Sequence, residues 1–136
     1  EVYFNLGNVL YETDHKKEAA KRYLEAVQID KEYVEALNNL GNALAATGFF
    51  EEAVEAYRKA INIEPNYKEA YHNRGLALME TGQLQEALKD LSKSIELDDT
   101  YWSAYRHRSI LYQMLKKPNE SFQDYLSAKN LKAKKG

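Results

Sequence analysis

The sequence predicts an all-α protein, a solenoid of four stacked helical hairpins with about eight helices. Three observations lead to this fold class. A pattern of small, apolar and aromatic residues recurs every 34 residues along the 136-residue chain. Apolar residues within each copy follow the i, i+3, i+4, i+7 spacing of an amphipathic helix. Glycine and proline number only 6 and 2, which suits helices better than many hairpin turns.

The repeat is clearest at three glycines, Gly7, Gly41 and Gly75, which lie 34 residues apart. Further columns of the repeat keep their character: Tyr3, Leu37, Tyr71 and Tyr105; Leu10, Leu44, Leu78 and Tyr112; Ala19, Ala53, Ala87 and Ser121; Tyr23, Tyr57, Leu91 and Tyr125. The four copies align without insertion. They divide the chain into residues 1–33, 34–67, 68–101 and 102–133 with a basic tail at 134–136, all within one solenoid domain.

Each copy contains two helical segments separated by a short break such as ATGFF or ETGQ. The expected helices cover residues 1–13, 16–29, 34–46, 50–63, 68–80, 84–97, 102–115 and 119–131. Small residues such as Gly41 and Ala53 allow the two helices of a hairpin to approach closely. One hairpin cannot cover its own apolar face, so the copies stack and bury a continuous core. The tyrosines expected in this core are Tyr3, Tyr23, Tyr57, Tyr71, Tyr105 and Tyr125.

Charged residues replace apolar ones at one column of the third and fourth copies. Arg74 and Arg108 stand where the first two copies have leucine, and Asp90 and Asp124 follow sixteen residues after each arginine. The arginine and the aspartate lie on facing helices of one hairpin. We therefore predict two salt bridges, Arg74–Asp90 and Arg108–Asp124.

Composition narrows the classes of function. The chain has no cysteine, which excludes disulfides and thiolate chemistry. No apolar run approaches the ~20 residues of a membrane span, and no basic-then-apolar leader opens the chain. We therefore expect no membrane insertion and a location in the cytoplasm or another intracellular compartment. The sequence contains no glycine-rich phosphate loop and no H-E-x-x-H pattern, so neither an enzyme nor a cofactor is expected.

Two further ligand classes are not expected. His72 and His107 fall near each other on successive hairpins but lack a third ligand, so the sequence predicts no metal site. Net charge is −2 overall, whereas residues 102–136 carry eight Lys or Arg against two acidic residues. Positive charge attracts nucleic acid, but the short basic tail has no accompanying set of aromatic residues for stacking on bases. We therefore expect no nucleic-acid binding.

The spacing Leu-Gly-x2-Leu, then Ala-x3-aromatic, then Pro, at a period of 34 residues, resembles the tetratricopeptide repeat. The second copy carries the motif most fully, in Leu37, Leu40, Gly41, Leu44, Ala53, Tyr57, Ala60 and Pro65. The resemblance extends over about residues 1 to 133. It implies a right-handed superhelix in which the first helix of each copy lines a concave groove. It also implies a role in binding other proteins.

The groove-facing positions implied by this resemblance are rich in asparagine. A carboxamide offers both donors and an acceptor, so a row of them can hold the backbone of an extended peptide whatever its side chains. Asparagine also lowers helix propensity, which favours a binding role over simple solvation. The expected partner-binding residues are Asn5, Asn8, Asn38, Asn39, Asn42, His72, Asn73, Arg106 and His107. Tyr11, Glu12, Leu76, Met79 and Ile110 are expected on the same face.

Two groups of relatives guide the functional expectation. Similar asparagine ladders occur in the tetratricopeptide region of O-GlcNAc transferase, which threads peptides through its groove. Co-chaperones of the family hold acidic tails with a clamp of Lys, Arg and Asn. The matching positions here are Phe4, Asn8, Asn39, Glu69 and Asn73 or, one copy later, Asn38, Asn42, Asn73, Ser103 and His107. Both registers keep the asparagines and lack all three cations, so binding to acidic chaperone tails is not expected.

We therefore expect a non-catalytic interaction scaffold that binds an extended segment of a protein partner in the concave groove. One alternative is a regulatory or substrate-docking region of a larger enzyme, or a co-chaperone-type adaptor. Another is a purely structural array without a ligand. The uncapped ends of the stack are expected to offer apolar surface for self-association.

Overall fold

The computed structural model describes residues 1–135, and within them the chain forms eight α-helices and no strand. The helices are α1 (Val2–Glu12), α2 (Lys16–Ile29), α3 (Val34–Ala46), α4 (Phe50–Ile63), α5 (Lys68–Glu80), α6 (Leu84–Leu97), α7 (Trp102–Met114) and α8 (Pro118–Lys135). The predicted helix ends differ from these by more than one residue only at the C-terminal end of α8.

Helix α8 continues to Lys135, so two residues expected in a basic tail belong to the helix. Gly136, the last residue of that expected tail, lies outside the described residues. The segment Leu-Lys-Ala-Lys-Lys before it contains only good helix formers. Lysines at the end of a helix also interact favourably with its dipole. The prediction ended the helix too early because it followed the length of the earlier repeats.

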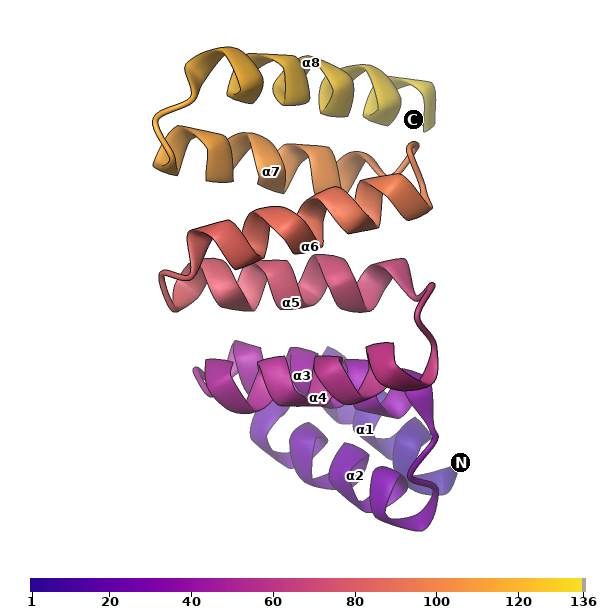
Figure 1. The fold of residues 1–136 in the computed structure, drawn as a ribbon. Helices are drawn as coiled ribbons and strands as arrows, with labels where there is room; N and C mark the ends of the chain where they lie inside the picture. Colours follow the sequence, from indigo (N-terminus) through magenta and orange to yellow (C-terminus); the bar gives the residue numbers. More distant parts are fainter. Residues whose placement is uncertain (136) are drawn as a thin grey trace.

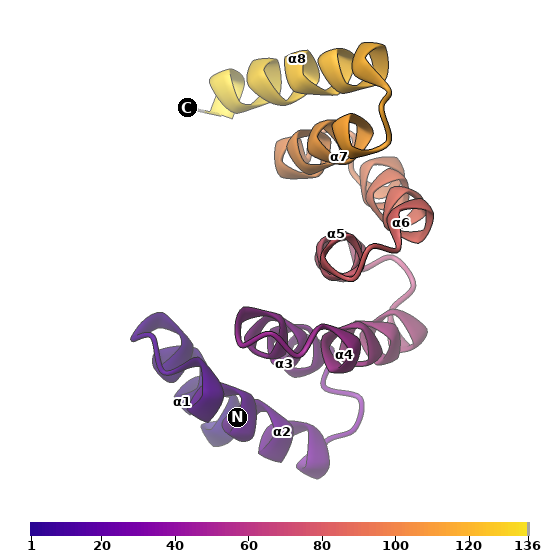
Figure 2. The same cartoon turned by 90° about the vertical axis from the view of Figure 1, so that its left-hand side faces the viewer.

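The eight helices stack as four hairpins from α1 to α8 (Figure 1). Seen after a quarter turn, the stack curves into an arc (Figure 2). Helices α1, α3, α5 and α7 lie on its inner side, and α2, α4 and α6 lie on its outer side. The first helix of every copy therefore lines the concave surface, as the resemblance to the tetratricopeptide repeat implied, and the fold is an all-α helical-repeat solenoid.

Each first helix ends in the same turn. The backbone φ is positive at the same repeat position in every hairpin, namely at Asp14 (66°), Gly48 (88°), Gly82 (80°) and Lys116 (60°). The next residue donates its N–H back to a carbonyl five residues earlier, for example from Phe49 to Leu44 at 2.8 Å. This pairing satisfies a carbonyl left open at the helix end. All four hairpins therefore reverse direction with the same geometry.

Close contact inside each hairpin depends on the conserved small residue of the first helix. A Cβ atom on Gly7 would stand 2.7 Å from the ring of Tyr23, and one on Gly41 would stand closer still to the ring of Tyr57. These two rings are almost fully buried. The other predicted core tyrosines Tyr3, Tyr71 and Tyr105 are only half-buried.

Tyr125 does not belong to the core. Its side chain is 53 % exposed, so its predicted burial is wrong. The equivalent residues Tyr23, Tyr57 and Leu91 are covered by the next hairpin, whereas nothing in residues 1–135 packs over α8. Apolar side chains are also exposed on α1, at Val2 and Val9.

Both predicted salt bridges are present. Nε of Arg74 lies 2.7 Å from Oδ2 of Asp90, and Nε of Arg108 lies 2.6 Å from Oδ2 of Asp124. The two carboxylates are buried, so each pair joins the helices of its hairpin in the interior rather than on the surface.

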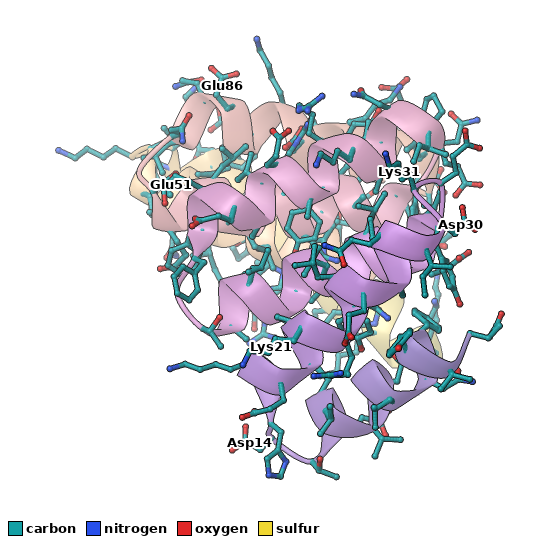
Figure 3. The ribbon with its side chains drawn as sticks, turned by 90° about the horizontal axis from the view of Figure 1, so that it is seen from below. Asp14, Lys21, Asp30, Lys31, Glu51 and Glu86 are labelled. Atoms are coloured by element: carbon teal, nitrogen blue, oxygen red, sulfur yellow. The ribbon has the colours of Figure 1, made fainter. Side chains whose placement is uncertain are left out.

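The outer helices carry exposed charged side chains, and exposed apolar ones such as Leu24 and Ile29 on α2. Lys21, Glu51 and Glu86 project from α2, α4 and α6 at the periphery of the molecule (Figure 3). Across the described residues, the helices lack the combined length and apolar character that crossing a bilayer requires.

Candidate functional site

Three neighbouring cavities are lined mainly by the first helices of the hairpins. The N-terminal cavity, about 170 Å³, is lined by Asn8, Tyr11, Glu12, Tyr23, Asn39 and Asn42. The central cavity, about 620 Å³, is bordered by α3, α4, α5 and α7, and the C-terminal cavity, about 390 Å³, lies between α7 and α8. Tyr11 and Asn42 line both the first and the second cavity, and Ile110 lines both the second and the third. The first two cavities therefore form one groove lined by residues of all four hairpins, and the third adjoins it at Ile110, on the face of α7 and α8 that corresponds to the covered faces of the earlier copies.

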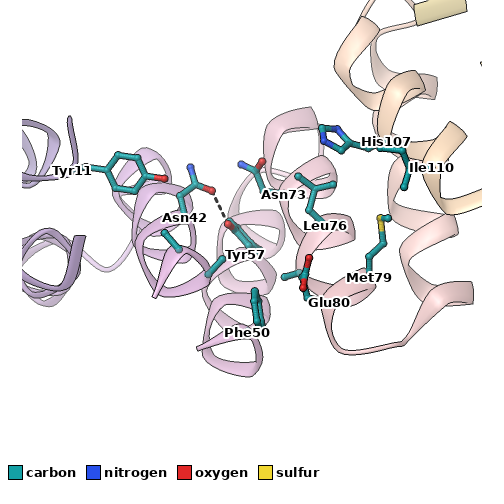
Figure 4. Close-up of a pocket in the computed structure, with 13 residues that line it drawn as sticks. Tyr11, Asn42, Phe50, Tyr57, Asn73, Leu76, Met79, Glu80, His107 and Ile110 are labelled. Atoms are coloured by element: carbon teal, nitrogen blue, oxygen red, sulfur yellow. Dashed lines mark hydrogen bonds between the residues drawn. The ribbon is translucent and has the colours of Figure 1, made fainter. Parts of the chain in front are cut away.

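The central cavity combines an apolar surface with a polar rim (Figure 4). Its apolar part is formed by Leu76, Met79 and Ile110 from the first helices of the third and fourth hairpins, together with Phe50 from α4. Its polar groups are Asn42, Asn73, the Tyr57 hydroxyl, His107 and the carboxylate of Glu80. A few fixed polar groups around apolar side chains are typical of binding sites in proteins.

Two of the groove asparagines hold buried tyrosine hydroxyls. The Tyr23 hydroxyl donates to Oδ1 of Asn8 at 2.5 Å, and the Tyr57 hydroxyl donates to Oδ1 of Asn42 at 2.6 Å. Burial raises the pKa of Tyr23 to about 12 and that of Tyr57 further, so both hydroxyls keep their protons. Asn8 and Asn42 therefore satisfy hydroxyls that would otherwise be buried without a partner.

The sequence contains a signal for this pairing. In the third copy the tyrosine column holds Leu91, and the asparagine column holds Leu76. Where no hydroxyl needs a partner, the amide is also absent. In the fourth copy the asparagine column holds Ile110, although Tyr125 is present, and the Tyr125 side chain is exposed.

Other amides connect neighbouring copies. Nδ2 of Asn39 donates to Oδ1 of Asn8 at 3.1 Å, and Nδ2 of Asn73 donates to Oδ1 of Asn38 at 3.1 Å. These bonds fix the spacing of successive first helices along the groove. Within residues 1–135 no hydrogen bond uses Oδ1 of Asn39 or Nδ2 of Asn42, so one acceptor and one donor group remain available in the groove.

Between the third and fourth copies, two histidines take the place of the amides. Nε2 of His72 lies 3.0 Å from Nδ1 of His107, whose other neighbour is the carbonyl oxygen of Ser103 at 2.9 Å. A carbonyl only accepts, so Nδ1 of His107 carries the proton and Nε2 of His72 is the acceptor. Nδ1 of His72 faces the Tyr101 hydroxyl at 3.2 Å.

Both histidines are neutral near pH 7. Burial, assisted by the neighbouring His107, lowers the pKa of His72 to about 4. Burial also lowers the pKa of His107. The described part of the chain contains no group of three or more His, Cys, Asp or Glu placed to hold a metal ion.

The nine predicted site residues do not all line the same cavity. Asn8, Asn39, Asn42, Asn73 and His107 line the N-terminal or central cavity, and Arg106 lines the C-terminal cavity. Asn5 is exposed on α1 and lines none of the three cavities described above.

Asn38 and His72 are only 6 % and 5 % exposed, so the expectation that they face an open groove is wrong. They share one repeat position with Arg106. The first helix of the following copy covers this position, and Arg106 stays exposed because residues 1–135 contain no fifth copy.

Several lining residues were not predicted. Glu80 borders the central cavity, and its repeat position is that of Glu12, which was expected on this face. Phe50 enters the groove from a second helix, which the repeat pattern assigns to the outer layer. The C-terminal cavity is lined by Trp102, Tyr125, Lys129 and Lys132 besides the residues of α7 named above.

Comparison with known proteins agrees with this architecture. Residues 17–48 and 41–82 match a family model described as TPR repeat, and residues 69–101 match the tetratricopeptide repeat model. No curated protein matches the sequence. Among solved structures, MamA from Desulfovibrio magneticus RS-1 superposes with a TM-score of 0.89 at 15 % identity, over 97 % of this chain and 75 % of that chain.

Two further structures show the same fold. YrrB, described as a TPR protein with an unusual peptide-binding site, has a TM-score of 0.82 at 22 % identity, over 95 % of this chain and 66 % of that chain. The first TPR of Spaghetti (RPAP3), bound to the HSP90 peptide SRMEEVD, has a TM-score of 0.82 at 24 % identity, over 85 % of this chain and 91 % of that chain. From its matched repeats, its hairpins and its curvature, the chain belongs to the tetratricopeptide repeat family.

Proposed function

We propose that the protein is a non-catalytic interaction scaffold whose concave groove binds an extended segment of a partner protein. The observation that supports this function is the continuity of the groove. Two cavities joined at Tyr11 and Asn42 are lined by residues of all four hairpins, and the third adjoins them at Ile110. A continuous channel fits a chain of residues better than it fits one compact small molecule.

The polar groups of the groove suit a peptide backbone. Oδ1 of Asn39 can accept from a backbone N–H, and Nδ2 of Asn42 can donate to a backbone carbonyl. Each of these side chains is already held at its other end, Asn39 by Asn8 and Asn42 by the Tyr57 hydroxyl. Because the amides are fixed before a partner arrives, little side-chain entropy is lost on binding.

The apolar part of the central cavity supplies the second component of binding. Leu76, Met79 and Ile110 present side chains that are not fully buried. An apolar side chain of the partner would remove this surface from water, at about 25 cal/mol per Å². YrrB is described as having a peptide-binding site, and the RPAP3 structure contains a bound peptide. Both support the proposal that the fold binds a peptide here.

A cavity-filling variant tests the proposal. Ala46 lines the central cavity from the exposed end of α3, so Ala46→Trp should occupy the groove without disturbing the core. Ala133→Trp on the exposed surface of α8 adds the same side chain outside the three cavities. Peptides selected from a random phage-displayed library would be labelled and measured by fluorescence anisotropy.

We expect Ala46→Trp to weaken peptide binding by about tenfold or more, a loss of about 1.4 kcal/mol, and Ala133→Trp to leave it unchanged. Selection of no peptide, or equal binding by the two variants, would contradict the proposal. Circular dichroism of both variants checks that the helices are intact.

A further inference from the structure

The N-terminal and central cavities each contain one carboxylate and no cation. Glu12 is the only charged residue that lines the first, and Glu80 is the only one that lines the second, since the pKa of His107 is lowered by burial. Neither carboxylate forms an ion pair within residues 1–135. The two cavities therefore contain carboxylates without ion-pair partners, and Lys16, whose Nζ lies 4.4 Å from the centre of the Tyr11 ring, is itself paired with Asp14.

The C-terminal cavity has the opposite charge. Arg106, Lys129 and Lys132 line it, and no carboxylate does. The Nζ of Lys132 lies 4.9 Å from the centre of the Trp102 ring, so this charge is held beside the cavity. Across the part of the chain that the structure describes, none of the three cations forms a salt bridge.

These unpaired charges contrast with the paired ones inside the hairpins. Arg74 and Arg108 are neutralised by buried aspartates of their own hairpins. The groove charges instead face outward into cavities that join at Ile110. The groove is therefore lined by two unpaired carboxylates on α1 and α5, and the cavity that adjoins its C-terminal end at Ile110 is lined by three unpaired cations on α7 and α8.

We propose that this groove selects extended segments whose charges are separated, with lysine or arginine in one half and carboxylates in the other. The basic half lies in the N-terminal and central cavities near Glu12 and Glu80. The acidic half, an Asp or Glu side chain or a terminal carboxylate, lies in the C-terminal cavity near Arg106, Lys129 and Lys132. The inference rests on the proposed function, because it requires an extended segment in the groove.

The physical basis is complementarity along the length of the groove. Charges are screened over ~8 Å at physiological ionic strength, so each half of the ligand responds chiefly to its own half of the groove. A segment placed in the opposite register meets like charges at both ends, which is costly. The charge separation therefore fixes both the choice of ligand and its direction in the groove.

Composition-matched peptides test the inference. Four fluorescein-labelled peptides are needed, each with Leu and Ala in the middle. Two peptides have Lys in one half and Asp in the other, and they differ in whether the Lys half is N-terminal or C-terminal. The third peptide alternates Lys and Asp. The fourth has Gln and Asn in place of Lys and Asp. We expect at least one separated peptide to bind about tenfold tighter than the alternating one. This advantage should disappear in about 1 M NaCl, where screening acts over ~3 Å.

Equal affinity for the separated and alternating peptides would overturn the inference while leaving the groove proposal intact. Absence of binding by all four peptides, together with failure of the library selection, would instead contradict the proposed function itself. The two results are therefore distinguishable.

Charge-reversal variants locate the effect. Glu80→Lys should weaken the tighter separated peptide by about tenfold and leave the Gln/Asn peptide unchanged. Its control is Glu64→Lys, which makes the same charge change at the exposed C-terminal end of α4. Lys132→Glu should have the same effect, against Lys21→Glu on α2 as control.

Equal losses in a variant and its control would show a general charge effect and overturn the assignment of the two halves. A labelled oligothymidylate serves as a polyanion probe. If it binds more tightly than every peptide and depends on Lys132, the positive half is a nucleic-acid surface and the inference is wrong.

Discussion

The guanidinium of Arg74 donates two hydrogen bonds to the carboxylate of Asp90, from Nε to Oδ2 at 2.7 Å and from Nη2 to Oδ1 at 2.8 Å. The hydrogen bond to Asp90, more than any other contact, raises the pKa of Arg74. In the second hairpin the same two positions hold Leu40 and Ala56, both buried. The chain thus contains an ionic and an apolar version of one interhelix contact.

Replacement of the ionic version by the apolar one should reveal the cost of an unpaired charge. Arg74→Leu leaves the buried Asp90 carboxylate without its partner, and we expect a loss of about 3 kcal/mol in the free energy of unfolding. The double variant Arg74→Leu/Asp90→Ala, which copies the second hairpin, should unfold within about 1 kcal/mol of the wild type. Urea unfolding followed by circular dichroism measures both, and additive losses in the double variant would contradict this expectation.

Alanine at two equivalent glycines should have different effects. A methyl group at Gly41 would overlap the ring of Tyr57, which its bond to Asn42 holds in place. At Gly75 the nearest atom is Cγ of Leu91 at 3.1 Å, in a side chain that can adjust. We expect Gly41→Ala to destabilise the protein by about 2 kcal/mol. Gly75→Ala should remain within about 1 kcal/mol of the wild type, because alanine has the higher helix propensity.

Thermal unfolding of the two variants provides the comparison. Each variant is the control for the other, since both change the same repeat position in the interior of a first helix. Equal shifts in the midpoint would show that the tyrosine ring moves aside as easily as the leucine does.

Lys116 occupies a backbone conformation that suits glycine. Its φ is 60°, and the equivalent residues of the two central hairpins are Gly48 and Gly82. A left-handed conformation costs a residue with a side chain about 1 kcal/mol. We therefore expect Lys116→Gly to stabilise the fold by up to about 1 kcal/mol, and Gly82→Ala to destabilise it by a similar amount. Chemical denaturation tests both, and destabilisation by Lys116→Gly would disprove this interpretation of the turn.

Acid should weaken the contact between the third and fourth copies. The pKa of His72 falls from 6.5 to about 4 in the folded chain, chiefly through burial. Between these values the unfolded chain binds the proton more readily, so the stability is complete above about pH 6.5 and is lost as the pH falls towards about 4. The loss amounts to about 3 kcal/mol at most.

A histidine variant isolates this contribution. Asn38 occupies the equivalent position of the second copy, so His72→Asn supplies a side chain that does not titrate. Unfolding measured between pH 7 and pH 4 should change less for the variant than for the wild type. An identical pH dependence would assign the acid sensitivity to other groups.

The period of the sequence was sufficient to predict the helices and the two buried salt bridges. The bridges followed because arginine and aspartate appear together at these two facing positions in the third and fourth copies, where the second copy holds Leu40 and Ala56. This inference needs only the register of two columns. No estimate of side-chain angles is required.

The candidate binding surface was harder to predict for a physical reason. The burial of Asn38 depends on the next copy, which covers it, whereas Arg106 at the same repeat position stays exposed. Residues at the same repeat position therefore differ in their surroundings, depending on whether a further copy packs against them. Which atom of each side-chain amide forms a hydrogen bond also depends on distances that differ by a few tenths of an ångström. The periodic pattern of the sequence does not contain these distances.

The identical turns that end the first helices have a consequence for how such a gene can change. Because every copy begins and ends at equivalent points, recombination between copies adds or removes a whole hairpin and keeps the junctions of the remainder. The groove would then grow or shrink by one copy at a time. Under the proposed function, the length of partner that the groove can hold would therefore change in steps of one copy, independently of the residues that contact the partner.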